Sequence, residues 1–482
     1  MRLRQLQKPG SLESVTKPQQ PDSGRKRYAV CGLSNRAIAT FIRPILGSTT
    51  AEDGVLGYGA NADDYSPVAE LVALVDVDGP RMAAFCNELG SDPSEVACYH
   101  PDDFDQMIID CRPDALIVAS PDRTHVGYIR AGLEHGLDVI TEKPMTATAA
   151  QAEDVRQAVA ETGGRLRVTH NLRYTPRHRR LKQLIMDGAI GRVLQIGLAY
   201  HVDIRHGASY FVRWNRHRAD SGGLPIHKSC HHLDLVDWLI DDLPERVSAQ
   251  AGLDFYGPNG AHRPHDHDGR PLTGTAVDDQ DPYYRSQAGS AVLPSAAGGS
   301  RAGSGLPYTV QYRDDRPMTI YDDAIDIEDH YSALIGYRRG AALLYSIDFS
   351  SPWEGYALTI TGTGGRLETS YARALDGTPM TGNDVIEVQP LFEAAETITV
   401  QTGGSGHDGA DPAMRADLFG EQSEESLRLG MVPTLDQAAY AVAAGEAIWR
   451  SAQSGTTVLV DDLLTAEAAP IAPAEVQCKR GS

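Results

Sequence analysis

Three histidines, a lysine and an aspartate fall within the eight residues from His227 to Asp234. A glycine pair, Gly222 and Gly223, leads into this stretch, and apolar residues with helical spacing follow it. His227, His231 and Asp234 are spaced i, i+4 and i+7, so a single helix would place all three on one face. Because imidazoles beside an ammonium group are costly to bury, we predict a catalytic or binding site here.

The same spacing allows a different chemistry, since histidines at i and i+4 also occur in zinc-binding helices. Lys228 argues against a metal, because it stands where a zinc protease carries its glutamate base and a cation repels the ion. A second histidine-rich segment, residues 262–268, has the composition of a flexible loop. We therefore predict no metal site; the candidates set aside in that segment are His262, His265, Asp266, His267 and Asp268.

A site of this kind needs a scaffold, and the chain begins with one suited to a dinucleotide. The apolar run from Arg27 to Gly32 stops at a glycine and precedes a helix-like stretch over residues 37–46. Strand, tight turn and helix open a dinucleotide-binding fold, although an ordinary strand–helix turn has the same pattern. Small residues let the backbone approach a pyrophosphate, and the helix N-terminus offers N–H groups. The candidate cofactor-binding residues here are Gly32, Ser34, Asn35 and Arg36.

The next apolar run, residues 69–76, ends in Asp76. A carboxylate at this strand end holds a ribose 2′-hydroxyl and repels a 2′-phosphate, so we predict NAD rather than NADP as the cofactor. Strand and helix patterns then alternate as far as residue 174, which predicts a parallel sheet with the site at the carboxyl ends of its strands. The predicted strands cover 114–121, 137–144 and 165–174, and the predicted helices cover 78–89, 124–135 and 147–162.

Glu142-Lys143-Pro144 closes the predicted strand over residues 137–144. Proline has no N–H to donate to a neighbouring strand and fixes the turn, so Lys143 is predicted to project at the cofactor edge of the sheet. A solvated Glu-Lys surface pair is the alternative. The apolar strand that comes immediately before disfavours that alternative.

Beyond residue 330, alternating polarity and closely spaced turns predict an antiparallel sheet. We therefore predict an α/β fold: an N-terminal Rossmann domain with a parallel sheet, and a C-terminal α/β domain with a large open, mostly antiparallel sheet. The expected parts are a disordered arm over 1–26, a dinucleotide domain over 27–170, a substrate and oligomerisation domain over 171–465 with a long loop over 257–305, and a disordered tail over 466–482. In the second domain we predict strands over 246–256, 331–337, 341–349, 356–362, 366–369, 384–389 and 457–460, a glycine-rich loop over 406–411 and a helix over 435–450.

Composition excludes some classes of protein. The net charge of −21 disfavours a nucleic-acid partner, and no apolar run is long enough to span a bilayer. The six cysteines include no C-x-x-C pair, which indicates reduced thiols and a cytoplasmic protein. Residues 172–218 run against the overall charge, with ten Arg or Lys and two acids, a balance of +8. We interpret residues 201–218 as a wall or lid for a polar or anionic substrate, with a solvated face as the alternative.

At four places the chain resembles the glucose–fructose oxidoreductase, inositol dehydrogenase and MocA (Gfo/Idh/MocA) family. They are the turn at Gly32, the segment Ser120-Pro-Asp-Arg-Thr-His125, Glu142-Lys143-Pro144, and the glycine pair followed by His231-x-x-Asp234. The last two together are fairly specific, and the resemblance runs from about residue 27 to residue 464. It implies NAD(P)-dependent chemistry on sugars, polyols and their derivatives, with Ser120, Pro121, His125, Glu142 and Lys143 beside the cofactor.

By this resemblance Lys143 lies near the reacting carbon and the nicotinamide, and His231 takes the position of the proton donor and acceptor. Two residues depart from the family pattern: His227 stands where an aspartate is usual, and Lys228 is a further change. We include both among the candidate catalytic residues. The pattern also resembles a branch of longer bacterial members that has a loop like the one from His407 to Asp411. The candidate substrate contacts are Arg173, Tyr174, Arg205, Arg213, His232 and His407.

The first hypothesis is an NAD-dependent oxidoreductase that transfers hydride at a secondary carbinol, C3 of a sugar or sugar derivative. The alternative, implied by longer family members, is an NAD-dependent glycoside hydrolase that oxidises C3, eliminates the C1 substituent, adds water and reduces the ketone again, with an anionic sugar as one candidate substrate. Three imidazoles and two ammonium groups exceed the needs of a simple dehydrogenase, which keeps this alternative open. A metal hydrolase is disfavoured by Lys228, and a non-catalytic ligand-binding regulator by the presence of both Lys143 and His231. We expect a small-molecule carbohydrate as substrate and a homo-oligomer, because an open sheet leaves surface to cover.

Overall fold

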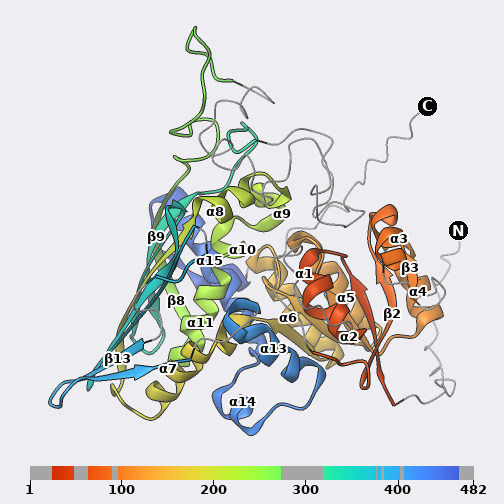
Figure 1. The fold of residues 1–482 in the computed structure, drawn as a ribbon, viewed down its shortest axis with the longest axis horizontal. Coiled ribbons are helices and arrows are strands. Elements are labelled where there is room, and N and C mark those ends of the chain that lie inside the picture. The colour runs from red at the N-terminus through yellow and green to blue at the C-terminus, as the bar shows by residue number, and fades with distance from the viewer. Residues whose placement is uncertain are drawn as a thin grey trace, which may run out of the picture.

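The computed structural model describes residues 24–47, 63–88, 96–272, 319–375, 377–380, 385–401 and 406–465. Residues 1–23 of the predicted arm, residues 273–305 of the predicted loop and the whole predicted tail lie outside the described residues. Two sheets divide the described chain, one within residues 26–169 and the other within residues 193–459. They lie side by side with helices between them (Figure 1).

The first sheet is parallel throughout, as predicted, and its strand order is β3-β2-β1-β4-β5-β6. Its central strands are buried because their residues are almost all apolar, as an internal parallel sheet requires. The order reverses between β1 and β4, where an open parallel sheet forms its ligand crevice. Its strands are β1 (Lys26–Cys31), β2 (Ala69–Val75), β3 (Ala97–Tyr99), β4 (Ala115–Val118), β5 (Asp138–Glu142) and β6 (Leu166–Thr169). Its helices include α3 (Gly79–Glu88), α4 (Phe104–Cys111), α5 (His125–Glu134) and α6 (Ala149–Thr162).

The helix predicted after the first strand is three short segments in a row. α1 (Asn35–Ala37) passes into a π-helical turn, η1 (Ile38–Ile42), and then into α2 (Arg43–Ile45). The Ser34 hydroxyl accepts a hydrogen bond from the Ala37 N–H and so caps the start. This cap therefore fixes the conformation of the turn between β1 and the helical stretch.

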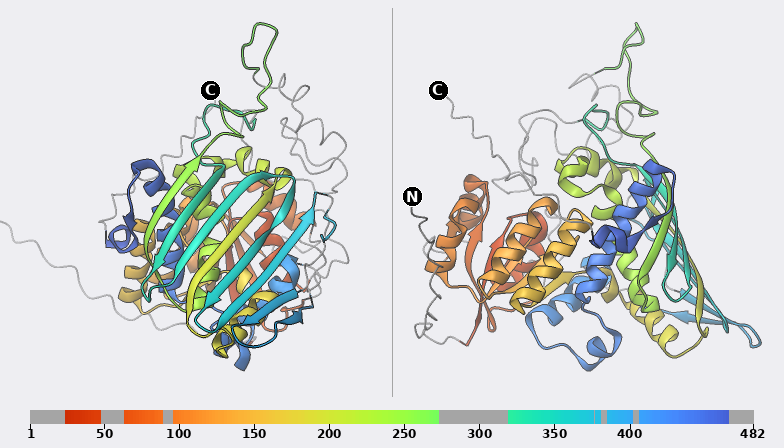
Figure 2. Two further views of the ribbon diagram at one scale, coloured as in Figure 1. Left: turned by 90° about the vertical axis from the view of Figure 1, so that its left-hand side faces the viewer. Right: turned by 180° about the vertical axis from the view of Figure 1, so that it is seen from behind.

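The second sheet has nine strands in the order β14-β13-β12-β11-β7-β10-β9-β8-β15, and all neighbours are antiparallel except β7 and β10. Buried and exposed residues alternate along β9 and β10, so only one face is packed against helices. Figure 2 (left) shows the other face, with no helix in front of it. The strands are β7 (Val193–Asp203), β8 (Pro244–Gly252), β9 (His330–Tyr337), β10 (Ala342–Ser351), β11 (Trp353–Gly362), β12 (Gly365–Ala374), β13 (Val385–Pro390), β14 (Glu396–Thr399) and β15 (Val458–Leu459).

The helices of the second domain carry most of the predicted site residues. They are α7 (Pro176–Met186), α8 (Ile204–Phe211), α9 (Arg218–Ser221), α10 (Leu224–His227), α11 (Cys230–Ile240), α13 (Gly406–Phe419), α14 (Glu424–Leu429), α15 (Leu435–Ser454) and α16 (Val460–Thr465). Short 3-10 turns are η2 (Pro101–Asp103), η3 (Asp122–Thr124), η4 (Asn171–Tyr174) and η5 (Trp214–Arg216). In the described part of the chain, no helix has the length and apolarity needed to cross a membrane.

Several parts of the second domain differ from the prediction. β7 and β14 were not predicted, although β7 is a central strand of the sheet and β14 forms one of its edges. The predicted glycine-rich loop over 406–411 is instead the first part of α13. Tertiary contacts override the loop-forming composition there: the Phe419 ring packs 5.5 Å from that of Tyr28, and Arg415 pairs with Asp63 at 2.6 Å.

One long helix, α15, joins the two domains. Its start is fixed by a capping box between Thr434 and Gln437. The Glu446 carboxylate accepts a hydrogen bond from the Ala149 N–H, 2.6 Å away, at the first turn of α6. At Gly445 a Cβ would lie 2.4 Å from the Pro225 carbonyl oxygen, so α10 packs directly on this helix. α15 therefore sets the position of α10 relative to the nucleotide domain.

Candidate active site

The histidine-rich stretch forms two helices, not the single helix predicted. α10 ends at His227, and α11 begins at Cys230. Between them the Ser229 hydroxyl lies 2.5 Å from the Tyr331 hydroxyl and 2.6 Å from the Tyr345 hydroxyl, so the strands of the sheet draw the backbone inward. The prediction that the histidines share one helical face is therefore wrong, and each histidine has its own surroundings.

The glycine pair lets this stretch approach the nucleotide domain. Gly222 has φ of 73°, and a Cβ there would lie 2.3 Å from the Ala147 carbonyl oxygen. Across the same seam the Lys143 Nζ donates a hydrogen bond to the His227 carbonyl oxygen at 3.0 Å. The predicted catalytic lysine and the histidine stretch are therefore brought together, although they lie on different domains.

His231 is held as a neutral base. Burial, and then the ammonium groups of Lys143 and Lys228, lower the pKa of its imidazole well below 6.5. Its Nδ1 is buried and has no hydrogen-bond partner among the described residues. A neutral imidazole beside a lysine is suited to accept a proton from a substrate hydroxyl.

Behind His231 lies His170, which was not predicted as a site residue. It directly follows β6, its ring stands edge-on to that of His231 with centroids 6.2 Å apart, and burial lowers its pKa to about 4. Its Nδ1 is 3.6 Å from the Asp234 carboxylate, which also pairs with Arg173 through contacts of 2.8 and 2.5 Å. His170 could have been predicted from the sequence, because it directly follows a strand of the parallel sheet and such strand ends form the site. Its contact with His231 is visible only in the fold.

His227 forms a carboxylate–imidazole pair with Asp122. The His227 Nδ1 lies 2.5 Å from the Asp122 Oδ2, and the rings of Tyr210 and Trp214 pack edge-on against the imidazole. Burial lowers the pKa of His227, the Asp122 carboxylate opposes this, and Lys143 reinforces it. Because Asp122 binds Nδ1–H, it fixes the tautomer and leaves Nε2 as the basic nitrogen. Asp122 lies in the quoted Ser120–His125 segment but was not itself predicted.

Lys228 is the second ammonium group at the site. Its Nζ lies 5.3 Å from the centre of the Tyr200 ring, and burial lowers its pKa to about 8 despite the nearby Glu354. Burial opposes ionisation of Glu354, but His206, Lys228 and Arg373 together hold the pKa of that carboxyl well below its usual range. Lys228 therefore exchanges its proton closer to neutral pH than an exposed lysine does.

Three predicted substrate contacts lie behind the site. Arg173 is fully buried in its pair with Asp234, and Tyr174 is 4% exposed and donates a hydrogen bond to Asp417. His232 is 2% exposed, stacks on Tyr200 at 4.1 Å and bonds to the Tyr345 hydroxyl. All three side chains are buried and bonded within the protein, so they are placed to position the site residues.

The remaining substrate candidates are more varied. Arg205 is partly exposed, and its guanidinium donates a hydrogen bond to the Leu375 carbonyl. Arg213 is partly exposed and precedes η5. The side chain of His407 lies outside the described residues.

Two of the four arginines in the predicted wall, residues 201–218, are neutralised within the protein. Arg216 pairs with Asp322 at 2.6 Å, and Arg218 pairs with Glu328 at 2.6 Å. The acids that balance the arginines lie far along the chain, so the local charge count in the sequence overstated the positive field at the site.

The first strand–helix turn fits a dinucleotide. Gly32 has φ of 92°, and a Cβ there would lie 2.5 Å from the backbone of Ser120. Asp76, 3% exposed, accepts hydrogen bonds from the Leu33 N–H at 2.6 Å and the Asp78 N–H at 2.9 Å. The turn therefore brings the start of a helical stretch close to a carboxylate that follows β2, and these are the groups that hold a pyrophosphate and a ribose in such folds.

Other predicted cofactor residues shape the loops around this crevice. The two ring nitrogens of His125, 1% exposed, each lie 2.9 Å from a carbonyl oxygen, that of Pro144 and that of Ser120. His125 therefore ties the loop after β4 to the Glu-Lys-Pro turn. Pro121 supplies the carbonyl that the Thr124 hydroxyl binds. Asn35 accepts a long hydrogen bond from Arg81. Arg36 and Glu142 form an ion pair at 2.9 Å.

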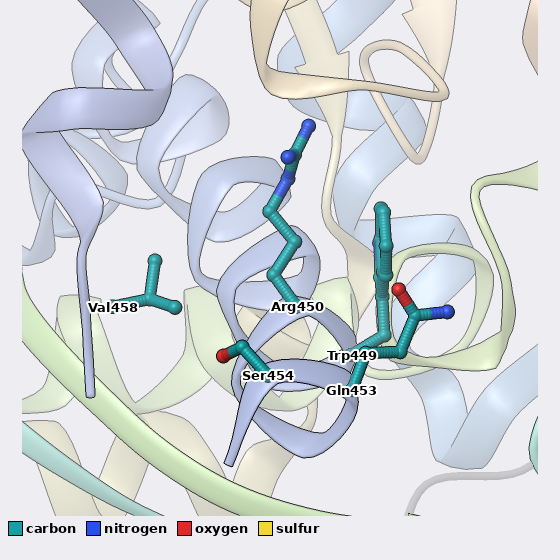
Figure 3. Close-up of a pocket in the computed structure, with 5 residues that line it drawn as sticks. All are labelled: Trp449, Arg450, Gln453, Ser454 and Val458. Carbon is teal, nitrogen blue, oxygen red and sulfur yellow. The ribbon is translucent and has the colours of Figure 1, made fainter. Parts of the chain in front are cut away.

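A surface hollow of about 400 Å³ lies at the end of α15 (Figure 3). None of the candidate catalytic residues lines it; its lining residues are Trp449, Arg450, Gln453, Ser454 and Val458. The guanidinium groups of Arg218 and Arg450 lie 4.7 and 5.0 Å from the centre of the Trp449 ring. Two cations over the indole remove the bare aromatic surface that a sugar ring would stack on. Within the described ranges, no group of three or more His, Cys, Asp or Glu side chains is arranged to hold a metal ion.

Two family models match the chain. The model described as the oxidoreductase family, NAD-binding Rossmann fold, matches residues 26–170, and that for the C-terminal alpha/beta domain of the same family matches residues 182–460. YteT of Bacillus subtilis (strain 168), named as an oxidoreductase, is 39% identical over 429 residues, which are 88% of this chain and 96% of YteT. Inositol 2-dehydrogenase of Rubrobacter xylanophilus is 31% identical over 183 residues, 38% of this chain and 48% of that enzyme.

Solved structures share the fold at low sequence identity. A levoglucosan dehydrogenase in complex with NADH and levoglucosan superposes with a TM-score of 0.59 at 16% identity, covering 90% of this chain and 99% of that one. An aldose-aldose oxidoreductase from Caulobacter crescentus superposes with a TM-score of 0.56 at 17% identity, with the same coverage.

The carboxylate at the end of β2 gives a first prediction. Asp76→Asn keeps an oxygen that accepts from the Leu33 N–H but removes the negative charge. We expect NAD to bind more weakly and NADP more tightly, so that the ratio of their dissociation constants shifts by about tenfold. Titration with both nucleotides measures the ratio. Asp78→Asn, which affects the neighbouring cap of α3, is the control and should leave the ratio unchanged; a wild-type preference for NADP would contradict the assignment.

Proposed function

Because the chain belongs to the Gfo/Idh/MocA oxidoreductase family and has its NAD-binding Rossmann domain, we propose that it oxidises a secondary carbinol of a sugar or sugar derivative with NAD. The observation that carries the proposal is the meeting of Lys143 with the histidine stretch across the domain seam, 3.0 Å from Nζ to the His227 carbonyl. This contact supports the proposal because it holds the Lys143 ammonium group near enough to His231 to lower the pKa of its imidazole.

A bound nicotinamide supplies the hydride acceptor for such a reaction. His231 accepts the hydroxyl proton, because burial and two nearby ammonium groups keep its imidazole neutral. Lys143 is positioned by its hydrogen bond and stabilises negative charge on the carbinol oxygen as the proton leaves. Asp76 supports NAD over NADP, because a buried carboxylate opposes a 2′-phosphate.

The substrate class follows from the relatives. Inositol 2-dehydrogenase and levoglucosan dehydrogenase are named for cyclic polyhydroxylated substrates, and this supports a carbohydrate with a ring carbinol. For a sugar, C3 is the position that we propose. The internal neutralisation of the arginines around η5 removes one reason to require an anionic sugar. A neutral sugar or polyol is therefore the simplest substrate for this site.

The Asp122–His227 pair favours a second candidate, redox-neutral glycoside cleavage. Oxidation at C3 acidifies the C2 proton; a second base removes it as the C1 substituent leaves, water adds, and hydride returns to C3. His227, with Nε2 free to act as a base, and Lys228, with a pKa of about 8, supply the extra base and acid that this sequence needs. A simple dehydrogenase needs one proton-transfer group, His231, with Lys143 as the cation beside it.

The uncovered face of the second sheet supports a homo-oligomer. Leu334 and Leu344 face each other on β9 and β10, are 52% and 49% exposed, and are flanked on β7 by Gly197. An exposed apolar pair on a broad sheet face is suited to packing against a second copy. The free cysteines of the described chain are consistent with the proposed cytoplasmic location.

Removal of the catalytic groups tests the main proposal. We expect His231→Ala and Lys143→Met each to lower turnover at least about a hundredfold while NAD still binds, since each removes a group that acts on the carbinol. NADH absorbance and released aglycone are followed together over a panel of free sugars and aryl glycosides. NADH formed from free sugars supports the dehydrogenase; aglycone released without net NADH supports the second candidate. If either variant turns over substrate at a near-normal rate, the assignment of that residue to the active site is wrong.

Asp122→Asn separates the two candidates further. The loss of the carboxylate frees the His227 tautomer, so glycoside cleavage should fall about tenfold or more while oxidation of a free sugar changes little. Rates of aglycone release and of NADH formation measure the two outcomes in one preparation. Asp220→Asn, which breaks the exposed Arg123 pair nearby, is the control. Equal loss of both activities would show that Asp122 does not serve a separate base.

Leu344→Asp tests the oligomer. A charge in the exposed leucine pair is costly to bury between subunits, so we expect the mass in sedimentation equilibrium to fall to that of one chain while the unfolding temperature of the domain is retained. Leu194→Asp, on an exposed position of β7, is the matched control. A wild-type protein that sediments as a monomer would contradict the proposal.

A further inference from the structure

We propose that α13 is a clasp that retains the dinucleotide, with Asp411 as its positioning residue. The proposal rests on the NAD-dependent function above, but it concerns release of the nucleotide and not the chemistry. It starts from an ion-pair cluster that the reaction does not use.

The cluster joins four elements through Arg36 and Asp411. The Arg36 Nε donates to the Glu142 carboxylate at 2.9 Å, and the two terminal nitrogens of Arg36 donate to the two oxygens of Asp411 at 2.9 and 3.1 Å. The Asn171 amide donates to the same carboxylate at 3.0 Å. Asp411 is 2% exposed, so the second domain inserts a buried charge that the nucleotide domain satisfies.

The three partners of the cluster mark the carboxyl edge of the parallel sheet. Arg36 lies in the helical stretch after β1, Glu142 ends β5, and Asn171 follows β6. The strand order changes direction between β1 and β4, so Asp411 is bonded on both sides of the switch point. A ligand bound at that switch point lies in the crevice outside these strand ends, where α13 is attached.

α13 is also fixed farther along its length. Arg415, 5% exposed, pairs with Asp63 at 2.6 Å, and Arg167 of β6 donates to the carbonyls of Asp417 and Leu418 at 3.0 and 3.1 Å. Phe419 packs against Tyr28 of β1. The C-terminal half of the helix is therefore held by several contacts, whereas Asp411 holds the N-terminal half, which is nearest the strand ends.

The alternative explanation is that the cluster only holds the domains together. A buried ion pair contributes little net stability, because desolvation offsets the attraction, whereas it fixes geometry strictly. Asp411 bonds to Arg36, and Arg36 bonds to Glu142, the residue before Lys143. These residues lie at the nucleotide end of the domain interface, which favours a role in nucleotide binding. The two explanations differ in which measured quantity changes when Asp411 loses its charge.

The test is the rate of NADH release. Wild-type protein and Asp411→Asn are loaded with NADH, mixed with excess NAD, and followed by NADH fluorescence; the unfolding temperature of each nucleotide-free protein is measured in parallel. We expect release to be faster by about tenfold or more in the variant, because a bidentate charge-assisted contact becomes a weaker neutral one. Asp436→Asn removes another ion pair between the domains, Arg156 with Asp436 at 3.0 Å, and should release NADH at the wild-type rate.

If Asp411→Asn releases NADH at a rate within twofold of wild type, the clasp proposal is wrong. If the variant also unfolds at a lower temperature, the cluster serves only to hold the domains together. If Asp411→Asn does not fold, Asn171→Ala, which removes only the neutral contact to Asp411, is judged by the same rate and should release NADH about threefold faster. Release is measured without sugar. Wild-type protein that binds NADH but oxidises no carbohydrate would refute the proposed function and leave the clasp intact.

Discussion

The chemistry of the candidate site depends on one contact between the domains, the hydrogen bond from the Lys143 Nζ to the His227 carbonyl. Two ammonium groups and three imidazoles gather at this seam. Burial, and then the positive charges of Lys143 and Lys228, lower the pKa of the His231 imidazole and keep it neutral. The packing between the domains therefore also determines the protonation state of His231.

Several features keep the histidine stretch close to the nucleotide domain. Gly222 has no side chain where the Ala147 carbonyl approaches, and Ser229 is drawn towards two tyrosines of the sheet. Arg173 neutralises Asp234 at the far side of His170. A side chain that looks like a substrate contact in the sequence, such as Arg173, is thus better understood as a support that orients the residues in front of it.

Local patterns in the sequence predicted the elements but not the partners. The parallel sheet, the Glu-Lys-Pro turn and Asp76 were predictable because apolar runs and the residues that end them are adjacent in the chain. His227 with Asp122, and Arg216 with Asp322, are about a hundred residues apart, and nothing local indicates that they meet. α13 escaped prediction because its glycines and proline favour a loop, and its stability comes from contacts with the nucleotide domain. β7 was missed although two glycines with positive φ, Gly188 and Gly191, mark the turn before it; the glycine within the strand, Gly197, weakens its strand pattern.

α15 touches α6 through Asp436 and Glu446 and carries α10 on another part of its surface. Each residue added to an α-helix turns everything beyond it by about 100°. One residue inserted between these two acids would point Glu446 away from α6 and carry Gly445 out of its contact with Pro225. We therefore expect related chains to vary the residues on the outer side of this helix while keeping its length between the two contacts constant.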